Sequence, residues 1–440
     1  MLQAVANAFK LPDLRRKIIF TLGVLVVFRL AAHVPIPGVE AESLRQVFQG
    51  SQLLGLLNML SGGAMQQFSV MAMGVYPYIT ATIVMQLLQP IIPGLADLAK
   101  EGEAGRNKLN QYALILTIPL AFLQAFSQTT VLAASGGVIR NFGFTATTWL
   151  PTLATLVTLT AGTMFAVWLG ELIDQQGVGN GISIIIFGGI VAGIPTQLRD
   201  LLAAGPLTGG ALVGLFALIT LVTVVVIVIV QEGQRRIPVQ YAKRVRGTKV
   251  YGGQSTHIPL QVNSAGMIPL IFALSILALP ELVGSYMQVS SVPWIKSIGQ
   301  FIFNTFTQSG NAYWVIYFLM VIGFTYFYTD IVFQQQNLAE NLQRQGGFVP
   351  GIRPGRRTAE YLSGVLRRIT LVGAVFLGVV AILPWLVRPL ASVLTGTAVH
   401  TSRMLVGSTG LLIVVGVVLD TMKQLEAQLL MRHYEGFIRR

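Results

Sequence analysis

The sequence has no cysteine and few charged residues, and each scarcity narrows the possible class of protein. Without cysteine there are no disulfides, thiolate metal sites or cysteine nucleophile. Charged residues make up 11% of the 440 residues, whereas an average soluble domain has roughly 25%. Hydrophobic residues make up 53%. A chain this apolar has too little polar surface to cover a globule in water, so we expect an integral membrane protein.

Acidic residues are absent from the middle of every long apolar stretch, because all seventeen fall in connecting segments, tails or span ends. Ion-coupled transporters normally hold protons or cations on such groups at the bilayer midplane, so this pattern argues against a secondary transporter. The sequence also contains no HExxH zinc motif and no GxxxxGK[ST] phosphate loop. We therefore expect no enzymatic activity, no catalytic or metal-binding residues and no cofactor, with the driving force supplied by another protein.

Long apolar stretches of about 20 residues are the dominant feature of the sequence. Ten of them are candidate membrane spans: 18–34, 74–92, 110–133, 148–170, 181–198, 211–231, 265–283, 313–333, 369–387 and 405–422. Arg29 is the one cation inside such a stretch, and snorkelling toward the outer surface explains it. No small-residue cleavage site follows the first stretch, so we expect that span to be retained.

The distribution of Lys and Arg predicts the topology. With a cytoplasmic N-terminus, twenty-three of the thirty fall on the cytoplasmic side and six on the other. This asymmetry fits the positive-inside rule with both termini in the cytoplasm, and it explains the net charge of +13 without nucleic-acid binding. We expect an all-α polytopic membrane protein with ten transmembrane helices in two inverted, pseudo-symmetric halves of five, 1–204 and 205–440.

Several long segments, in the same order along the chain, resemble the SecY family of protein-conducting channels. They are SGGAMQQFSVMAMGVYPYITATIVMQLL (61–88), EGEAGRNKLNQY (101–112), GTMFAVWLGELI (162–173), GVGNGISIIIFGGIVAGIP (177–195), QRRIPVQYAKR (234–244), QSTHIPLQVNSAGMIPLIFA (254–273), GGFVPGIRPGRRTAEYL (346–362) and LLIVVGVVLDTM (411–422). Small departures occur at Val75, Tyr76 and Gln261. The resemblance implies a channel that translocates unfolded, signal-bearing polypeptides across the bacterial cytoplasmic membrane and releases membrane segments laterally into it.

The resemblance also implies a constriction of aliphatic side chains within the channel. Residue by residue, this pore ring falls on Ile79, Ile83, Ile186, Ile190, Ile271 and Ile413. Two pairs are spaced i, i+4, so each pair lies on one helix face. An apolar constriction resists wetting and ion flow. From spacing alone, these isoleucines read as ordinary helix packing.

A plug and a lateral gate follow from the same resemblance. The plug falls on Ser61, Gly62, Gly63, Ala64, Met65, Gln66, Gln67, Phe68 and Ser69; without the resemblance, this segment reads as an external loop. The lateral gate lies between the second and seventh spans, with the third and eighth beside them. There Gln124 and Asn263 are at positions suited to a closed-gate hydrogen bond, and generic helix contact is the alternative for each.

Two basic cytoplasmic loops, 232–257 and 334–367, are too long for plain turns. The resemblance implies that they dock the SecA ATPase or the ribosome, including ribosomal RNA, whose phosphates suit positive charge. Arg353 is the principal docking candidate, with Arg356, Arg357, Arg235, Arg236 and Arg244 in support. The other partners implied are SecE, SecG, preproteins with signal sequences, and membrane lipid.

Two further readings remain open from the residues. A secondary transporter for small solutes shares the inverted-repeat plan, and a lipid-embedded scaffold has no pore. Ion-gradient-dependent uptake distinguishes the first, and electrical conductance after deletion of 61–69 distinguishes the second.

Overall fold

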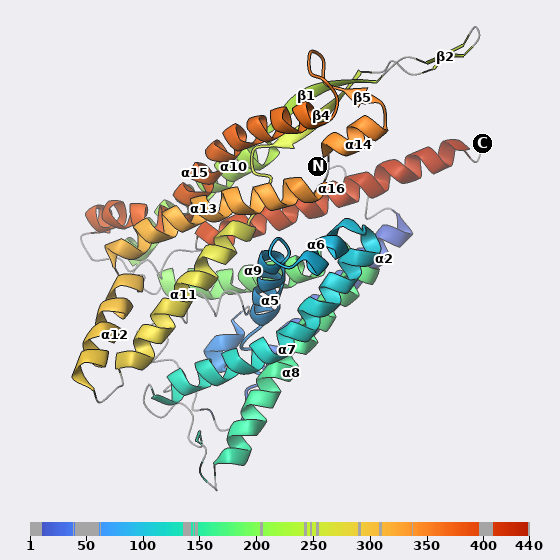
Figure 1. The fold of residues 1–440 in the computed structure, drawn as a ribbon. Helices are drawn as coiled ribbons and strands as arrows, with labels where there is room; N and C mark the ends of the chain where they lie inside the picture. Colours follow the sequence, from blue (N-terminus) through green and yellow to red (C-terminus); the bar gives the residue numbers. More distant parts are fainter. Residues whose placement is uncertain are drawn as a thin grey trace.

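The computed structural model describes most of the chain as helix (Figure 1). The described residues are 11–37, 39, 61, 63–134, 142–143, 145, 148–202, 206–241, 244–246, 249–251, 255–288, 292–307, 310–336, 338–395 and 408–438. Each of the ten stretches expected from the sequence overlaps one of its helices.

The first part of the described chain contains six α-helices and a short 3-10 helix. They are α2 (Pro12–Ala31), η1 (Ala64–Gln67), α5 (Tyr76–Leu88), α6 (Pro93–Lys100), α7 (Glu103–Ala134), α8 (Trp149–Gln176) and α9 (Gly181–Leu202). Proline stands in the first turn of α2, α5 and α6, where its missing N–H costs no helical hydrogen bond. Between α5 and α6 the chain bends by 104°.

The second part contains seven α-helices. They are α10 (Pro206–Glu232), α11 (Ile268–Gln288), α12 (Pro293–Phe306), α13 (Asn311–Gln336), α14 (Leu338–Arg344), α15 (Arg356–Thr395) and α16 (Ser408–Ile438). Helix α15 begins eleven residues before the end of the loop expected at 334–367, so that loop is shorter than expected. Leu362 and Val365 in this first part of α15 are buried against a β-sheet, which explains why the helix forms there.

Strands form two small sheets, so the expectation of an all-α fold is corrected to a mostly helical one. In the larger sheet, β1 (Gln234–Tyr241) lies between β4 (Ser255–Gln261) and β5 (Gly347–Phe348), and both pairings are antiparallel. The smaller sheet pairs β2 (Arg244–Arg246) with β3 (Lys249–Tyr251). Ile237 and Val239 alternate with exposed neighbours along β1 and are buried against α14 and α15.

Large apolar side chains remain exposed along the long helices, as lipid contact requires. Leu221 and Ile229 on α10 are 63% and 65% exposed. By length and composition, five described helices can cross a membrane, and a sixth span is added if the bent pair α5–α6 is counted as one. The chain is therefore a mostly helical, multi-pass membrane protein.

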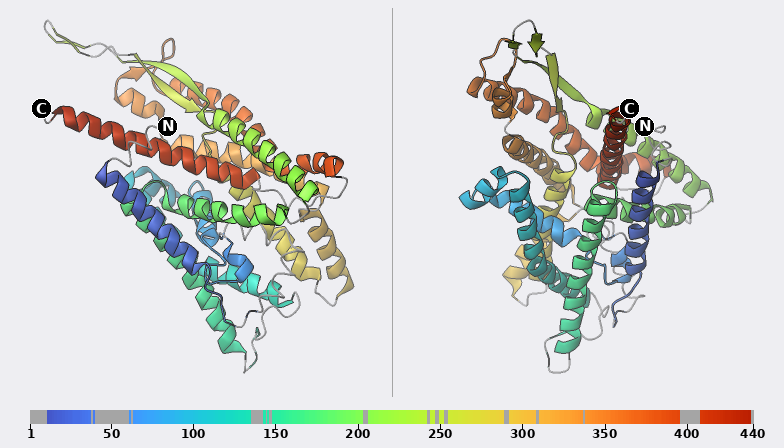
Figure 2. Two further views of the ribbon diagram at one scale, coloured as in Figure 1. Left: turned by 180° about the vertical axis from the view of Figure 1, so that it is seen from behind. Right: turned by 90° about the vertical axis from the view of Figure 1, so that its right-hand side faces the viewer.

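The two ends of the molecule differ in character. The start of α2, the end of α16 and the larger sheet lie toward one end, whereas α12 lies toward the other (Figures 1 and 2). This arrangement places the basic β-hairpin and the first and last described helix ends on a common side.

Candidate functional site

The six isoleucines of the expected pore ring lie on four helices, α5, α9, α11 and α16. Ile186, Ile190 and Ile413 are buried in one apolar cluster, and the half-buried Ile79 packs against it. Ile83 and Ile271 are buried in a second cluster, which Ile79 also contacts. The six residues therefore occupy two adjoining apolar clusters connected by Ile79.

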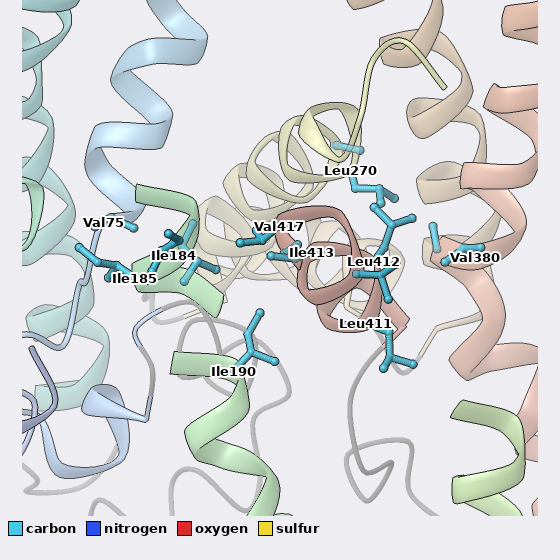
Figure 3. Packing of buried hydrophobic residues seen from close by; sticks show 14 of the residues in the cluster. Val75, Ile184, Ile185, Ile190, Leu270, Val380, Leu411, Leu412, Ile413 and Val417 are labelled. Atoms are coloured by element: carbon cyan, nitrogen blue, oxygen red, sulfur yellow. The ribbon is translucent and has the colours of Figure 1, made fainter. Parts of the chain in front are cut away.

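The first of these clusters joins helices that are far apart in sequence. Figure 3 shows Ile184, Ile185 and Ile190 of α9 across from Ile413 of α16, with Leu270 of α11 and Val380 of α15 toward the other side of α16. Aliphatic side chains from both parts of the chain thus meet in the interior of the membrane domain. Such an apolar centre offers ions no polar partner.

The expected plug segment is folded and largely buried. Helix η1 follows Gly63, which has a φ of 85°, and precedes Phe68, which has a φ of 42°. The N–H of Met65 donates to Oγ of Ser61 at 3.2 Å. Met65 and Phe68 are buried with side chains of α7 and α8, whereas Ala64 belongs to the cluster that contains Ile190. Gly62 lies outside the described residues.

The C-terminal end of the plug segment is fixed by backbone hydrogen bonds. The carbonyl of Phe68 accepts from the N–H of Ile36 at 3.1 Å, and the N–H of Val70 donates to the carbonyl of Val34 at 3.0 Å. Ser69 thereby pairs with Pro35 in an isolated bridge. Any displacement of the segment is therefore easier before Phe68 than after it.

Two close approaches hold this segment from opposite sides. On α8, a Cβ added to Gly162 would collide with the carbonyl oxygen of Val70. On α2, a terminal nitrogen of Arg29 lies 3.4 Å from the position of a Cβ on Gly63. Arg29 thus lies beside the plug segment, a location that snorkelling alone does not explain.

The hydrogen bond expected between Gln124 and Asn263 is not formed. Nε2 of Gln124 donates to Oγ1 of Thr80 at 3.4 Å, and Nδ2 of Asn263 donates to the carbonyl of Gly266 at 3.1 Å. The reason is position, because α11 begins only at Ile268 and Asn263 lies in the turn before it. The other oxygen of each amide is buried without a partner among the described residues.

Apolar and aromatic side chains connect α5 with α11 instead. Ile83 of α5 is buried with Ile271 and Phe272 of α11, and Leu87 and Ile268 extend this contact. The ring of Phe272 also meets Phe324 and Tyr328 of α13 edge-on, at centroid distances of 5.8 and 6.0 Å. This interface contains few polar contacts, so its strength depends on packing.

The basic residues expected to dock a partner gather around the larger sheet. Because β5 pairs with β1, the two expected docking loops form one structural unit. Arg235 and Arg236 on β1 are exposed, as are three arginines of the second loop: Arg353, Arg356 and Arg357. Arg356 pairs with Glu360 at 3.0 Å on the same helix. Arg244 lies on β2, and its side chain is outside the described set.

The turn that presents Arg353 depends on flanking glycines. Gly351 has a φ of 81° and Gly355 a φ of 99°, values that L-residues with a side chain rarely adopt. The carbonyl of Arg353 accepts a hydrogen bond from Oγ1 of Thr358 at 2.9 Å. The backbone of the turn is thus anchored to α15 while the guanidinium points to solvent.

A cavity of about 610 Å³ lies between the α5–α6 bend and helices α13 to α15. Its lining includes Gln89, Pro90 and Ala96 from the bend and Ile331, Ala339 and Arg356 from the opposite wall. It therefore lies beside the α5–α11–α13 contact and separates the first part of the chain from the second.

Sequence reasoning missed the aromatic contact of Phe272, the approach of Arg29 to Gly63, and the pairing of β5 with β1. The alternation of Ile237 and Val239 in QRRIPVQY is a signal for β1 that was available. The other contacts join residues far apart in sequence and leave no local pattern.

Comparisons with known proteins agree with this arrangement. The SecY family model matches residues 69–422. The protein translocase subunit SecY of Halalkalibacterium halodurans is 46% identical over 448 residues, which cover 100% of both chains.

Solved structures show the same fold. A protein-conducting channel aligns with a TM-score of 0.61 and 16% identity over 96% of each chain. Sec61 from a canine ribosome–channel complex of the endoplasmic reticulum aligns with a TM-score of 0.60 and 15% identity, also over 96% of each chain. At these identities the likeness concerns the fold alone.

Proposed function

We infer that this chain, which belongs to the SecY family of protein translocase subunits, forms a protein-conducting channel for unfolded, signal-bearing polypeptides. The observation that carries this conclusion is the 46% identity with a protein translocase subunit over the full length of both chains. The role is that of a transporter rather than a catalytic enzyme. The chain moves polypeptide across the membrane and releases membrane segments laterally into it.

The topology proposed is ten membrane spans in two inverted halves, with both termini in the cytoplasm. What supports it is the overlap of each expected stretch with a helix and the 23-to-6 distribution of Lys and Arg. For a bacterial relative of this kind, the membrane is the cytoplasmic one. The larger sheet, with its exposed arginines, then faces the cytoplasm.

The proposed seal consists of the six isoleucines and the plug segment. Burial of Ile190 and Ile413 in one cluster with Ala64 of the plug segment supports this assignment. In the closed state these side chains exclude water and ions. A polypeptide passes when the segment before Phe68 moves aside and the isoleucines yield around it.

The proposed lateral gate is the contact of α5 with α11 and α13. Packing of Ile83 against Ile271 and Phe272 supports it. An apolar signal sequence of roughly 7–15 residues replaces such contacts by equivalent ones, so the gate opens at small net cost. This balance is the physical reason for closing the gate with side chains of lipid-like polarity.

The proposed docking surface is the larger sheet with the Arg353 turn. Exposure of Arg353, Arg357 and Arg235 supports it, because acidic patches of a SecA-type motor and ribosomal RNA phosphates both attract such groups. The canine Sec61 structure comes from a ribosome–channel complex. We propose SecE and SecG as the membrane partners of the chain.

Reconstituted translocation tests the proposed function. The chain and its small membrane partners are placed in proteoliposomes with SecA, ATP and a signal-bearing preprotein, and the protease-protected fraction of preprotein is measured. Arg353→Glu is compared with Arg368→Glu, an equally exposed arginine on α15 outside the docking set. Because an interface hot spot contributes about 2 kcal/mol or more, Arg353→Glu is expected to lower protection at least tenfold, while Arg368→Glu retains it.

Equal protection in both variants keeps the channel and removes Arg353 from the docking surface. Absence of protection with well-inserted wild-type complex contradicts the channel function itself. Solute uptake driven by an ion gradient would then favour a secondary transporter.

A further inference from the structure

Helix α12 has three distinct faces along its 14 residues. One face packs on α11, where the buried Gly299 allows close approach: a Cβ on the facing Gly284 would lie 2.8 Å from the backbone nitrogen of Phe303. A second face is polar and exposed, with Lys296, Gln300 and Asn304 four residues apart. The third face is apolar and remains uncovered.

The uncovered apolar face consists of Trp294, Ile298 and Phe301, at spacings of four and three residues. These side chains are 65%, 43% and 72% exposed. Two large aromatic rings on a single exposed stripe are costly in water. The arrangement requires an apolar surface next to α12.

The position of α12 identifies that surface. It connects the end of α11 to the start of α13, and in the proposed topology both of these ends lie at the external membrane face. Figure 1 places α12 toward the end of the molecule remote from the larger sheet. On the neighbouring α13, Val315 and Leu319 form an exposed apolar stripe that continues into the bilayer.

We propose that α12 is an interfacial helix whose Trp294–Ile298–Phe301 face inserts into the outer leaflet of the membrane. Tryptophan favours the boundary between headgroups and acyl chains, and a helix with one apolar and one polar exposed face lies along that boundary. Lys296, Gln300 and Asn304 then face headgroups and water. Because α12 packs on α11, it links one wall of the proposed lateral gate to the lipid, and this inference rests on the topology of the proposed function.

Spin labelling tests this insertion without measuring transport. The chain has no cysteine, so Ile298→Cys, Gln300→Cys and Leu319→Cys each provide a single labelling site. Each full-length variant is labelled with a nitroxide and reconstituted in phospholipid vesicles with its membrane partners. The collision rates with oxygen, which concentrates in lipid, and with a water-soluble nickel chelate are then measured by electron paramagnetic resonance.

The expected result is that the labels at 298 and 319 collide mainly with oxygen, while the label at 300 on the same helix collides mainly with the nickel chelate. If the label at 298 meets the nickel chelate as often as the label at 300, α12 lies in water and the inference is wrong. If both reagents are excluded from 298, a protein covers the face and the inference is equally wrong. Nickel access to 319 would instead contradict the membrane topology on which the proposed function depends.

Discussion

At the scale of single residues, the closest approach to the plug segment is made by a glycine. Gly162 of α8 leaves no room for a Cβ beside the carbonyl oxygen of Val70. A backbone carbonyl cannot rotate away as a flexible side chain does, so the contact fixes both segments. The resemblance supplied the plug assignment, but neither the sequence nor the resemblance predicted this contact, because 92 residues separate its two partners.

Gly162→Ala is expected to destabilise the protein by about 1–3 kcal/mol, the usual cost of overpacking a closely packed site. The measurement is the unfolding temperature of the purified complex in detergent. Gly214→Ala on α10 is the matched control, since nothing lies within 4 Å of its added Cβ. That change should be neutral or stabilising by up to about 1 kcal/mol, as for other helical glycines. Equal unfolding temperatures for both variants would contradict the assigned contact.

At the scale of elements, the larger sheet is the part that sequence patterns predicted least well. Apolar stretches indicate helices directly, whereas the segments at 232–257 and 334–367 read only as basic loops. The alternation in β1 is short and interrupted by Pro238, and its partner β5 lies over 100 residues away. Strand pairing at that distance depends on the tertiary fold, which places the end of α14 beside β1.

Val239→Asp is expected to open this sheet, because Val239 is 0% exposed and a buried unpaired carboxylate costs about 3 kcal/mol or more. Hydrogen exchange of the amides in 234–241 and 255–261 measures the change. Gln240→Asp introduces the same charge at the next, exposed position and should leave exchange as in the wild type. Retained protection in Val239→Asp would show that the sheet does not depend on its apolar side.

At the scale of the whole molecule, the isoleucine clusters are the place where the two parts of the chain meet. Hydropathy predicted where the helices lie, and the resemblance predicted which isoleucines converge. Neither predicted that the six would divide between two clusters, or that Asn263 would precede α11. Those outcomes depend on how helices tilt and end, which a span of apolar residues does not encode.

Ile413→Ser and Ile190→Ser are expected to raise ion conductance in planar bilayers in the absence of preprotein. Truncation of a buried isoleucine costs about 2–5 kcal/mol in a packed core, and each 1.4 kcal/mol corresponds to a factor of about ten. The open fraction should therefore rise at least about tenfold. Val418→Ser on the exposed side of α16 is the control and should remain silent. Silent bilayers with all three variants would indicate that these isoleucines do not seal a pore.

The pairing of β5 with β1 has a mechanical consequence. Strands from two separate connections form a rigid handle that continues into α10, α11, α13 and α15, all in the second part of the chain. A ligand that grips this handle exerts torque on that part, while α2 to α9 are reached only through apolar contacts that slide. The same grip that brings a polypeptide to the channel thus acts as a lever that separates the two walls.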